Sequence, residues 1–387
     1  MQTIDIQEQI LDKLSTLIVV LNRNGDVEYV SKYAEQLLGF YSDELLGNAW
    51  WEVTRFSQAE SKIVKQKILD AFRYPSAKTQ MFEHELKTAL GGRKWVRWNI
   101  SDLNEEQLIA VGYDITDTKL NEKRLIENNK QLQEQNNDIK DSIHYAQRIQ
   151  QSILQTPDQL KNIFSNSFLL YKPKDIVSGD YYWFYEDTNY KYIAVVDCTG
   201  HGVPGAMMSM VANSIFKEVF INQKISEPAT VLTALDIELE KAVNKNQDQN
   251  FNDGMDIALV RISKMDNTLE FSGAFRSILI VRKNTIIELK GNRYPIGFYS
   301  DIEKQFNTEK FELQQGDSVY MYTDGFIDQF GGEKQKKLNK SNFKDLLLTI
   351  GDMTMSEQEA FLEYSFNNWK QDLEQTDDVL VLGFCIN

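Results

Sequence analysis

Residues 195–210 read VVDCTGHGVPGAMMSM, an apolar run that ends in an aspartate and is followed by closely spaced glycines. The apolar run predicts a buried strand, and the segment after Gly205 predicts a helix. An aspartate and glycines directly after a strand place a carboxylate at the rim of a sheet and let other backbone approach closely. The stretch therefore predicts an α+β arrangement with Asp197 at a sheet edge.

The same combination of an aspartate with small residues recurs along the C-terminal part of the chain. The further stretches are Ser178-Gly179-Asp180, Gly254-Met255-Asp256, Thr323-Asp324-Gly325 and Thr376-Asp377-Asp378. One such stretch is usually only a turn, but several at strand ends within one domain predict a site for a hard cation. Carboxylate and carbonyl oxygens suit Mg²⁺ or Mn²⁺, and the thiolate and imidazole set typical of zinc is missing.

Four of these stretches, in their order along the chain, resemble the PPM-type metal-dependent protein phosphatases. They are VSGDYYW (177–183), VVDCTGHGVPGAMMSM (195–210), YMYTDGFIDQFGG (320–332) and QTDDVLVLGF (375–384). The closest branch is that of stage II sporulation protein E and the stress sigma-factor regulator phosphatases. The segment DSIHYAQRIQQSIL (141–154) resembles the linker helix of that branch. The resemblance covers about residues 140–387 and implies an α/β sandwich of two central antiparallel sheets flanked by helices.

The resemblance also implies a site that binds two Mn²⁺ or Mg²⁺ ions. Asp197 would bridge them, Asp180 and the backbone carbonyl of Cys198 would serve one ion, and Asp324 and Asp377 would hold the other. Independently of the family, crowded carboxylates raise one another's pKa unless positive charge neutralises them. Water activated by the two ions would then hydrolyse phosphoserine or phosphothreonine without a protein nucleophile.

Four nearby groups have more than one interpretation. His201 either donates a proton to the leaving oxygen or caps the turn into the next helix. Asp256 either binds a third, more weakly held ion, or it orients metal ligands without touching the metal or caps the strand. Arg276 stands where related chains often carry His or Asn after Ala-Gly, and it either contacts phosphate or lies at an ordinary strand edge. No Cys-x5-Arg loop surrounds Cys198, so we interpret its thiol as a packing group.

The N-terminal region shows a second pattern of short strands. Leu17 to Leu21 is apolar, Asn24-Gly25 is a strong hairpin signal, and strand alternation follows at residues 27–29. Ser31 is placed to cap a helix that ends at Gly39, and residues 42–45 predict another short helical turn. Alternation over residues 82–87, a turn at Gly91-Gly92, and strands over 96–100 and 108–113 complete a meander.

This order of elements resembles a PAS sensor domain over about residues 12–118. The ending VGYDITDTK (111–119) resembles the family's exit into a helix, whereas Ser31 stands where many members have Asn. The ligand is not readable from the sequence, because both cysteines lie outside the region and exclude the flavin-binding Cys motif. His84 is expected in the core or lining a pocket rather than on a haem. Four tryptophans, Trp50, Trp51, Trp95 and Trp98, are expected in the core or at dimer contacts.

The segment between these regions is polar and lacks Gly and Pro from Ile115 to Pro157. Apolar residues recur every seven positions, which predicts a coiled coil. They are Leu125, Leu132, Ile139, Ala146 and Ile153, with Asn129, Asn136 and Ile143 on the companion seam. Asn at core positions lowers stability and selects register, which suits a dimeric signalling helix. The alternative is a single solvated helix that packs on its own chain.

Composition limits the function classes. The 387 residues include 42 Lys plus Arg and 57 Asp plus Glu, a formal net charge of −15, which disfavours nucleic acid as a partner. Two distant cysteines, Cys198 and Cys385, provide no disulfide framework. No apolar run approaches the roughly 20 residues that cross a bilayer, and the amphipathic start at residues 1–14 lacks a signal-peptide core. A cytoplasmic protein without membrane insertion is expected.

The sequence thus predicts an α+β protein with a PAS sensor (1–118), a coiled-coil linker (119–160) and a PPM-type phosphatase (161–387). The expected function is sensor-regulated hydrolysis of phosphoserine or phosphothreonine on a partner protein, by resemblance one with an anti-anti-sigma-like STAS domain. Homodimerisation through the coiled coil and the PAS domain is expected, and residues 141–153 with the helix after Gly205 are the expected bistable element. The rival hypothesis is a catalytically weak or inactive scaffold that binds its partner through the phosphatase-like domain.

Overall fold

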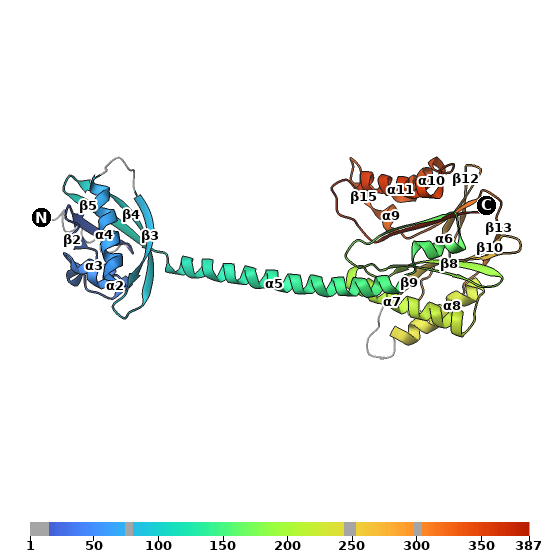
Figure 1. Ribbon diagram of the computed structural model, residues 1–387, viewed down its shortest axis with the longest axis horizontal. Coiled ribbons are helices and arrows are strands. Elements are labelled where there is room, and N and C mark those ends of the chain that lie inside the picture. The colour runs from blue at the N-terminus through green and yellow to red at the C-terminus, as the bar shows by residue number, and fades with distance from the viewer. Residues whose placement is uncertain (1–14, 74–79, 244–252, 298–303, 387) are drawn as a thin grey trace. The chain divides into compact units, whose positions relative to one another are not determined.

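The computed structural model describes residues 15–73, 80–243, 253–297 and 304–386 (Figure 1). The amphipathic start predicted at residues 1–14 lies outside the described residues. The chain divides into two compact units, Met1–Asn136 and Asn137–Asn387. In the described parts of the chain, no helix combines the length and apolar character needed to cross a bilayer.

The first unit is built on one antiparallel sheet of five strands in the order β2-β1-β5-β4-β3. The strands are β1 (Leu17–Asn22), β2 (Val27–Val30), β3 (Gln80–Lys87), β4 (Arg93–Asn104) and β5 (Gln107–Asp114). The helices are α2 (Tyr33–Leu38), the 3-10 turn η1 (Ser42–Leu45), α3 (Ala49–Val53) and α4 (Gln58–Arg73). The predicted hairpin and the β3-β4-β5 meander are therefore confirmed.

One prediction in this unit is wrong. Helix α2 ends at Gly39 in the left-handed conformation as expected, but its N-cap position is Lys32 and no side chain caps it. The Ser31 hydroxyl instead accepts a hydrogen bond from the Ile18 amide at 3.0 Å and donates to the Thr16 carbonyl. Ser31 lies directly after β2 and is fully buried, so its hydroxyl satisfies the edge of β1 rather than the helix.

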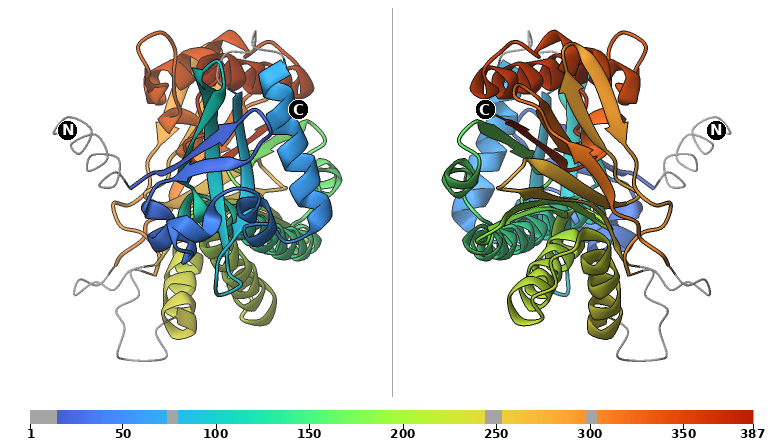
Figure 2. Two further views of the ribbon diagram at one scale, coloured as in Figure 1. Left: turned by 90° about the vertical axis from the view of Figure 1, so that its left-hand side faces the viewer. Right: turned by 90° about the vertical axis from the view of Figure 1, so that its right-hand side faces the viewer.

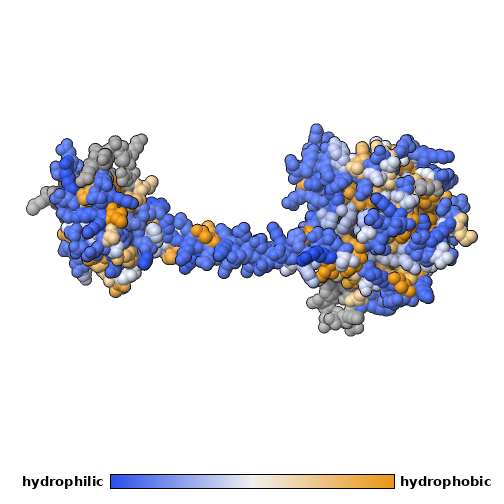
Figure 3. Space-filling view, viewed as in Figure 1, coloured by the Kyte–Doolittle hydropathy of each residue, from blue (hydrophilic) through white to orange (hydrophobic). Residues whose placement is uncertain are grey.

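Helix α5 (Thr116–Ile153) covers the predicted linker as a single element of 38 residues. Its predicted core positions are exposed in the isolated chain, with Leu125 at 62%, Leu132 at 56% and Ile139 at 57% exposure. Figure 3 shows that the visible face of α5 is mostly hydrophilic with a few apolar side chains. Gln150 is the buried residue among the described positions of this helix.

The second unit contains two five-stranded antiparallel sheets, as expected from the sequence. One has the order β13-β10-β9-β8-β7, and the other has the order β12-β11-β14-β17-β6. The first comprises β7 (Asp180–Glu186), β8 (Tyr190–Cys198), β9 (Met255–Ser263), β10 (Thr268–Ala274) and β13 (Glu309–Glu312). The second comprises β6 (Ser167–Lys172), β11 (Ile278–Arg282), β12 (Thr285–Leu289), β14 (Ser318–Tyr322) and β17 (Val379–Cys385).

Helices cover the outer face of each sheet of this unit (Figures 1 and 2). Helices α7 (Gly202–Lys217) and α8 (Pro228–Val243), joined by the π-helical turn η2 (Glu218–Asn222), cover the first sheet, and α10 (Asn339–Thr349) and α11 (Met355–Lys370) cover the second. The remaining elements are α6 (Pro157–Ile163), α9 (Gly325–Asp328) and the small hairpin β15 (Phe330–Gly331) and β16 (Lys336–Lys337).

Three apolar cores hold these layers together. The core between the sheets includes Ile193 and Val260 from one sheet and Ile280 and Leu382 from the other, all without solvent exposure. Each outer core joins a sheet to its helices. Both sheets are buried on two faces, which explains why their strands are almost continuously apolar, and the polar residues gather at the strand ends.

Candidate active site

Three neighbouring strands bring three of the predicted aspartates level with one another. In the antiparallel register, Asp180 at the start of β7 is opposite Asp197 on β8, and Asp197 is opposite Asp256 on β9. Directly opposed residues have Cβ atoms about 5 Å apart on one face of the sheet. The fold thus creates a row of three carboxylates across the first sheet.

The second sheet contributes two further aspartates to the same region. Asp324 follows β14 and is the N-cap residue of α9, and Asp377 lies two residues before the start of β17. The Thr323 hydroxyl donates a hydrogen bond of 2.7 Å to Asp180 Oδ2 and so links the ends of the two sheets. Asp180 and Asp324 are therefore held at a common edge although 143 residues separate Asp180 from Thr323.

The guanidinium of Arg276 lies among these carboxylates. Its Nη2 contacts Asp197 and lies 2.9 Å from Asp324 Oδ2 and 3.2 Å from Asp256 Oδ2. The Arg276 side chain is only 14% exposed, and its Nε is buried without a hydrogen-bond partner in the described structure. Neither interpretation of Arg276 from the sequence included this ion-pair cluster.

Burial governs the electrostatics of the cluster. It raises the pKa of Asp197 to about 8, with Arg276 opposing this rise and Asp324 adding to it. Burial, reinforced by Asp197, also raises the pKa of Asp180 far above its usual range. For Arg276, burial alone would lower the pKa, but the surrounding carboxylates raise it. The cluster therefore retains its carboxylates in the ionised form only while positive charge stays close to them.

The residue that shapes the loop before Asp180 is Asp378. Its Oδ1 accepts a hydrogen bond from the Lys174 amide and its Oδ2 accepts one from the Gly179 amide, each at 2.7 Å. The stretch Thr376-Asp377-Asp378 contains both aspartates, but the sequence prediction assigns only Asp377 to the site. Asp378 is buried, so its function in the structure is to orient backbone.

Glycines allow the loops around Asp180 and Asp197 to touch. A Cβ atom on Gly179 would lie 2.4 Å from the Gly200 carbonyl oxygen, and one on Gly205 would lie 2.1 Å from it. Both distances are far shorter than real Cβ contacts, and the obstacle is backbone that cannot rotate away. Gly179 and Gly205 are thus required by this contact.

His201 lies in the loop that joins β8 to α7. It occupies the N-cap position of α7, but its side chain makes no capping hydrogen bond. Its Nδ1 is 2.9 Å from Asp175 Oδ2, its Nε2 is 3.1 Å from Lys174 Nζ, and half of its side chain is exposed. The helix-capping interpretation of the imidazole is therefore wrong, and Asp175 and Lys174 are neighbours that the sequence did not indicate.

Cys198 is buried next to the cluster. Burial, together with the nearby Asp197 and Asp180, raises the pKa of its thiol well above the ordinary value. A thiol that stays protonated is a poor nucleophile, which agrees with its interpretation as a packing group. The Cys198 carbonyl oxygen points to the loop of Gly179, where an added Cβ would be 3.2 Å away.

The donor set suits a hard divalent cation. Among the described residues, no three acidic, histidine or cysteine side chains form a metal-ligand set as they stand, and the cation that the carboxylates surround is the Arg276 guanidinium. The guanidinium is a positive charge surrounded by carboxylate oxygens. Oxygen atoms of this kind are the ligands that Mg²⁺ and Mn²⁺ prefer. Asp197, Asp256 and Asp324 are 23%, 27% and 38% exposed, so the cluster opens to solvent.

Comparison with known proteins agrees with this geometry. Residues 187–387 match the stage II sporulation protein E (SpoIIE) family. The phosphoserine phosphatase RsbU of Bacillus subtilis is 25% identical over 314 residues, which are 78% of this chain and 82% of RsbU. RsbP of the same organism is 25% identical over 195 residues, or 49% of this chain and 46% of RsbP.

A solved structure supports the same relationship. The SiaA-PP2C domain of Pseudomonas aeruginosa superposes with a TM-score of 0.59 and 31% sequence identity, over 65% of this chain and 98% of that domain. The family match covers more than half of the chain and includes Asp197, Asp256, Asp324 and Asp377. The chain therefore belongs to the SpoIIE family and is a PPM-type protein serine phosphatase.

Proposed function

We propose that this phosphatase hydrolyses phosphoserine or phosphothreonine on a partner protein that resembles a STAS-domain anti-anti-sigma factor, under the control of its N-terminal domain. The observation that carries the proposal is the solvent-open row of aspartates at the joined edges of the two sheets, arranged around a single cationic group. RsbU and RsbP are phosphoserine phosphatases, which supports the substrate class.

Two Mn²⁺ or Mg²⁺ ions are the proposed cofactors. Asp180, Asp197, Asp324 and Asp377 would hold them together with the Cys198 carbonyl, and Asp256 is a candidate ligand for a further ion. When bound, such ions supply an activated water at neutral pH and neutralise charge on the phosphoryl oxygens. The buried carboxylates themselves favour this, because a second positive charge would relieve their mutual repulsion.

The positioned side chains around the cluster have separate tasks in this proposal. Arg276 carries a planar fork of donors that matches phosphate oxygens, and these donors become available once the guanidinium leaves the carboxylates. His201 is the proposed proton donor to the leaving serine oxygen. Asp175 orients its ring through the contact at Nδ1, and Lys174 lies beside Nε2.

The proposed regulation involves a PAS-type sensor at residues 1–118 and a dimeric coiled coil at 119–160. The C-terminal end of α5 contacts the site directly: Gln150 Nε2 donates to the Ser178 carbonyl at 2.7 Å and to Ser209 Oγ at 2.9 Å. Its Oε1 accepts from the Ser178 amide. Since Ser178 lies two residues before Asp180, a shift of α5 would move a proposed metal ligand.

The test is Mn²⁺-dependent hydrolysis of p-nitrophenyl phosphate and of a phosphoserine-bearing STAS protein. Asp197→Ala and Asp324→Ala should each lower the rate by at least about 100-fold. Asp352→Ala is the matched control, because Asp352 is exposed and remote from the cluster, and it should keep full activity.

Two outcomes would contradict the proposal. Full activity in both cluster variants would remove the metal-site assignment. A native protein that binds the STAS partner and Mn²⁺ but hydrolyses neither substrate would favour the scaffold hypothesis.

A further inference from the structure

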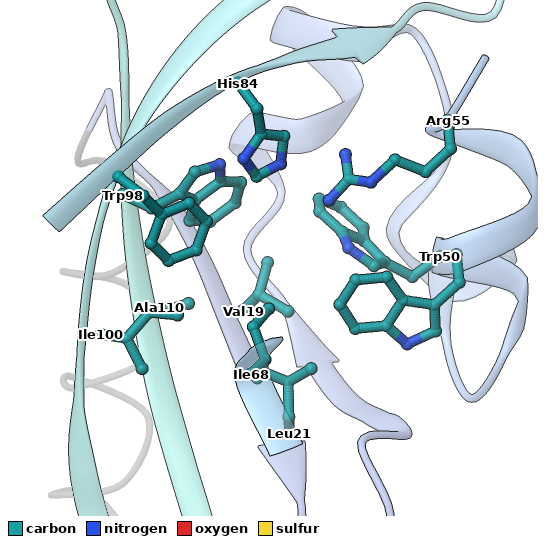
Figure 4. A pocket seen from close by; sticks show the side chains of 11 residues that line it. Val19, Leu21, Trp50, Arg55, Ile68, His84, Trp98, Ile100 and Ala110 are labelled. Atoms are coloured by element: carbon teal, nitrogen blue, oxygen red, sulfur yellow. The ribbon is translucent and has the colours of Figure 1, made fainter. Parts of the chain in front are cut away.

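Phe275 is an aromatic residue that packs in none of the apolar cores. An aromatic side chain is usually buried among others, as in the first unit, where Trp98 stacks on His84 and meets Trp50 edge to face (Figure 4). Phe275 instead is 51% exposed, and it belongs to none of the three cores that the described residues of the second unit form. Core packing therefore does not explain why an aromatic residue stands there.

The backbone of Phe275 is also unusual. Its φ angle is +56°, in the left-handed region that a β-carbon disfavours. The other non-glycine residues with positive φ in the described chain are Lys, Asn or Gln, so Phe275 is the aromatic one among them. A bulky residue held in this region points to a function that requires it there.

Neighbouring backbone holds Phe275 in this conformation. Its amide donates to the Asn292 carbonyl at 2.8 Å, and the Asn292 amide donates to the Gly273 carbonyl at 2.7 Å. A Cβ atom on Gly273 or on Gly291 would lie 2.3 or 2.4 Å from the Arg276 carbonyl oxygen. The turn is therefore packed against backbone, and residue 275 cannot relax without moving Arg276.

The same turn places Phe275 at the margin of the carboxylate cluster. Arg276, the next residue, directs its guanidinium into the cluster. The Phe275 backbone also forms an isolated bridge with Ile257, the residue after Asp256. Phe275 thus lies beside two groups of the site while it stays half exposed itself.

An exposed ring at this margin offers a contact that the cluster lacks. The cluster consists of charged groups, which can bind a phosphoryl group but cannot distinguish one phosphoserine from another, because that group is the same in all of them. A phosphatase that selects one phosphoprotein needs a contact outside the phosphoryl group. A flat apolar ring suits an aliphatic side chain, since burying the two together is favourable.

We propose that Phe275 is a specificity-determining residue, which packs against an aliphatic side chain next to the phosphoserine of the partner protein. This inference rests on the proposed function and adds the sequence context of its substrate, a phosphoserine flanked by aliphatic rather than polar residues. Because the turn holds residue 275 in place before the substrate arrives, little conformational freedom is lost on binding.

The experiment compares two phosphoserine peptides that differ only in the residues on both sides of the phosphoserine, which are Leu in one and Asn in the other. Phosphate release by the full chain with Mn²⁺ gives kcat and KM for each. The native chain should prefer the Leu peptide by about tenfold or more in kcat/KM, mainly through KM, since contact with one apolar group is worth roughly that factor. Phe275→Ala should bring the ratio close to one, and Phe275→Leu should keep part of it.

Tyr364→Ala is the matched control. Tyr364 is an exposed aromatic residue on α11, and its loss should leave the native preference unchanged. Equal kcat/KM of the native chain for the two peptides, or a native ratio in Phe275→Ala, would overturn the inference about Phe275 alone. A native chain that hydrolyses neither peptide would contradict the proposed function as well.

Phe275→Gly separates recognition from folding. Glycine adopts a positive φ freely, so this variant should keep the native unfolding temperature or raise it, while the preference for the Leu peptide is lost. Thermal unfolding of the same preparations measures the first effect. A marked fall in the unfolding temperature with the native preference retained would assign the ring to folding and overturn the proposal.

Discussion

At the scale of single residues, Arg276 is the side chain that most changes the description of the site. It is the positive charge that the structure places among Asp197, Asp256 and Asp324, at the position where the sequence suggested only carboxylates. A buried carboxylate cluster that loses its counter-charge is strongly destabilised. Arg276 therefore neutralises part of the charge of the cluster, and the divalent ions of the proposed function would compete with it for the same oxygens.

This competition predicts a metal-dependent stability. Arg276→Met should lower the unfolding free energy by about 3 kcal/mol in the presence of EDTA, because it leaves buried carboxylates without a partner. Saturating Mn²⁺ should restore most of the loss. Chemical denaturation with and without Mn²⁺ measures both effects.

Arg282→Met is the control for that measurement. Arg282 forms a similar ion pair with Asp317, away from the site, at 2.6 Å. The stability lost in Arg282→Met should not depend on Mn²⁺. An Arg276→Met variant that Mn²⁺ fails to rescue would show that the guanidinium and the metal do not share a site.

His84 predicts a pH dependence for the N-terminal domain. Burial, with Arg55 and Lys67 adding to it, lowers the pKa of His84 from 6.5 to about 3. The unfolded chain therefore binds more protons between these values, so stability is fully present above pH 6.5 and falls as the pH drops toward 3. The expected loss at a pH of about 5.5 is roughly 1.4 kcal/mol.

Urea unfolding at several pH values tests this directly. His84→Phe keeps the ring stack but cannot titrate, so it should flatten the stability between about pH 7.5 and 5.5 relative to the native chain. His144→Phe is the matched control, because His144 is exposed on α5. A native slope in His84→Phe would assign the pH dependence to other groups.

At the scale of elements, the end of α5 is joined to the second unit by buried amides rather than by apolar packing alone. Gln150 bonds to Ser178 and Ser209, and Gln155 pairs with both the amide and the carbonyl of Phe184 on β7. Hydrogen bonds of this kind fix direction and register. The position of α5 is thereby coupled to the strand that begins at Asp180.

Gln150→Ala should remove the hydrogen bonds that join α5 to Ser178 and Ser209. Leaving the Ser178 backbone groups unpaired should cost about 2 kcal/mol of stability, and a displaced Asp180 should lower phosphatase activity by about 10-fold or more. Unfolding measurements and Mn²⁺-dependent p-nitrophenyl phosphate hydrolysis report the two effects. Gln151→Ala is the control, because Gln151 is exposed, and equal behaviour of the two variants would reject the coupling.

At the scale of the whole molecule, the exposed seam of α5 bears on the predicted assembly. Leu125, Leu132 and Ile139 are more than half exposed on one chain, although they repeat at heptad spacing. Apolar residues at this spacing are stabilised when two helices pair. A dimer through α5 is therefore the expected assembly.

Replacing Leu132 and Ile139 together with Asn should convert this dimer to a monomer and change the basal phosphatase activity or its response to the sensor. Light scattering coupled to gel filtration measures the mass, and p-nitrophenyl phosphate hydrolysis measures the activity. The control replaces Gln133 and Lys140, one position further along, with Asn. Unchanged mass and activity in the seam variant would reject the coiled-coil hypothesis.

Much of the secondary structure could be predicted because it depends on neighbours along the chain. The alternation predicted over residues 82–87 lies within β3, and the Asn24-Gly25 turn joins β1 to β2. Ser31 shows the limit of such local rules. The local pattern predicted that its hydroxyl caps a helix, but burial against β1 pairs it with the Ile18 amide instead.

The sequence by itself determined which residues are candidates for the site, because aspartates next to small residues at predicted strand ends are local patterns. Only the tertiary structure decided which of them meet. Strand register aligns Asp180, Asp197 and Asp256, and packing brings Arg276 to Asp197 across 79 residues of sequence. The same holds for Arg55, whose burial beside His84 and Trp98 is invisible in sequence. Contacts between distant residues depend on how layers pack, and local patterns do not encode that packing.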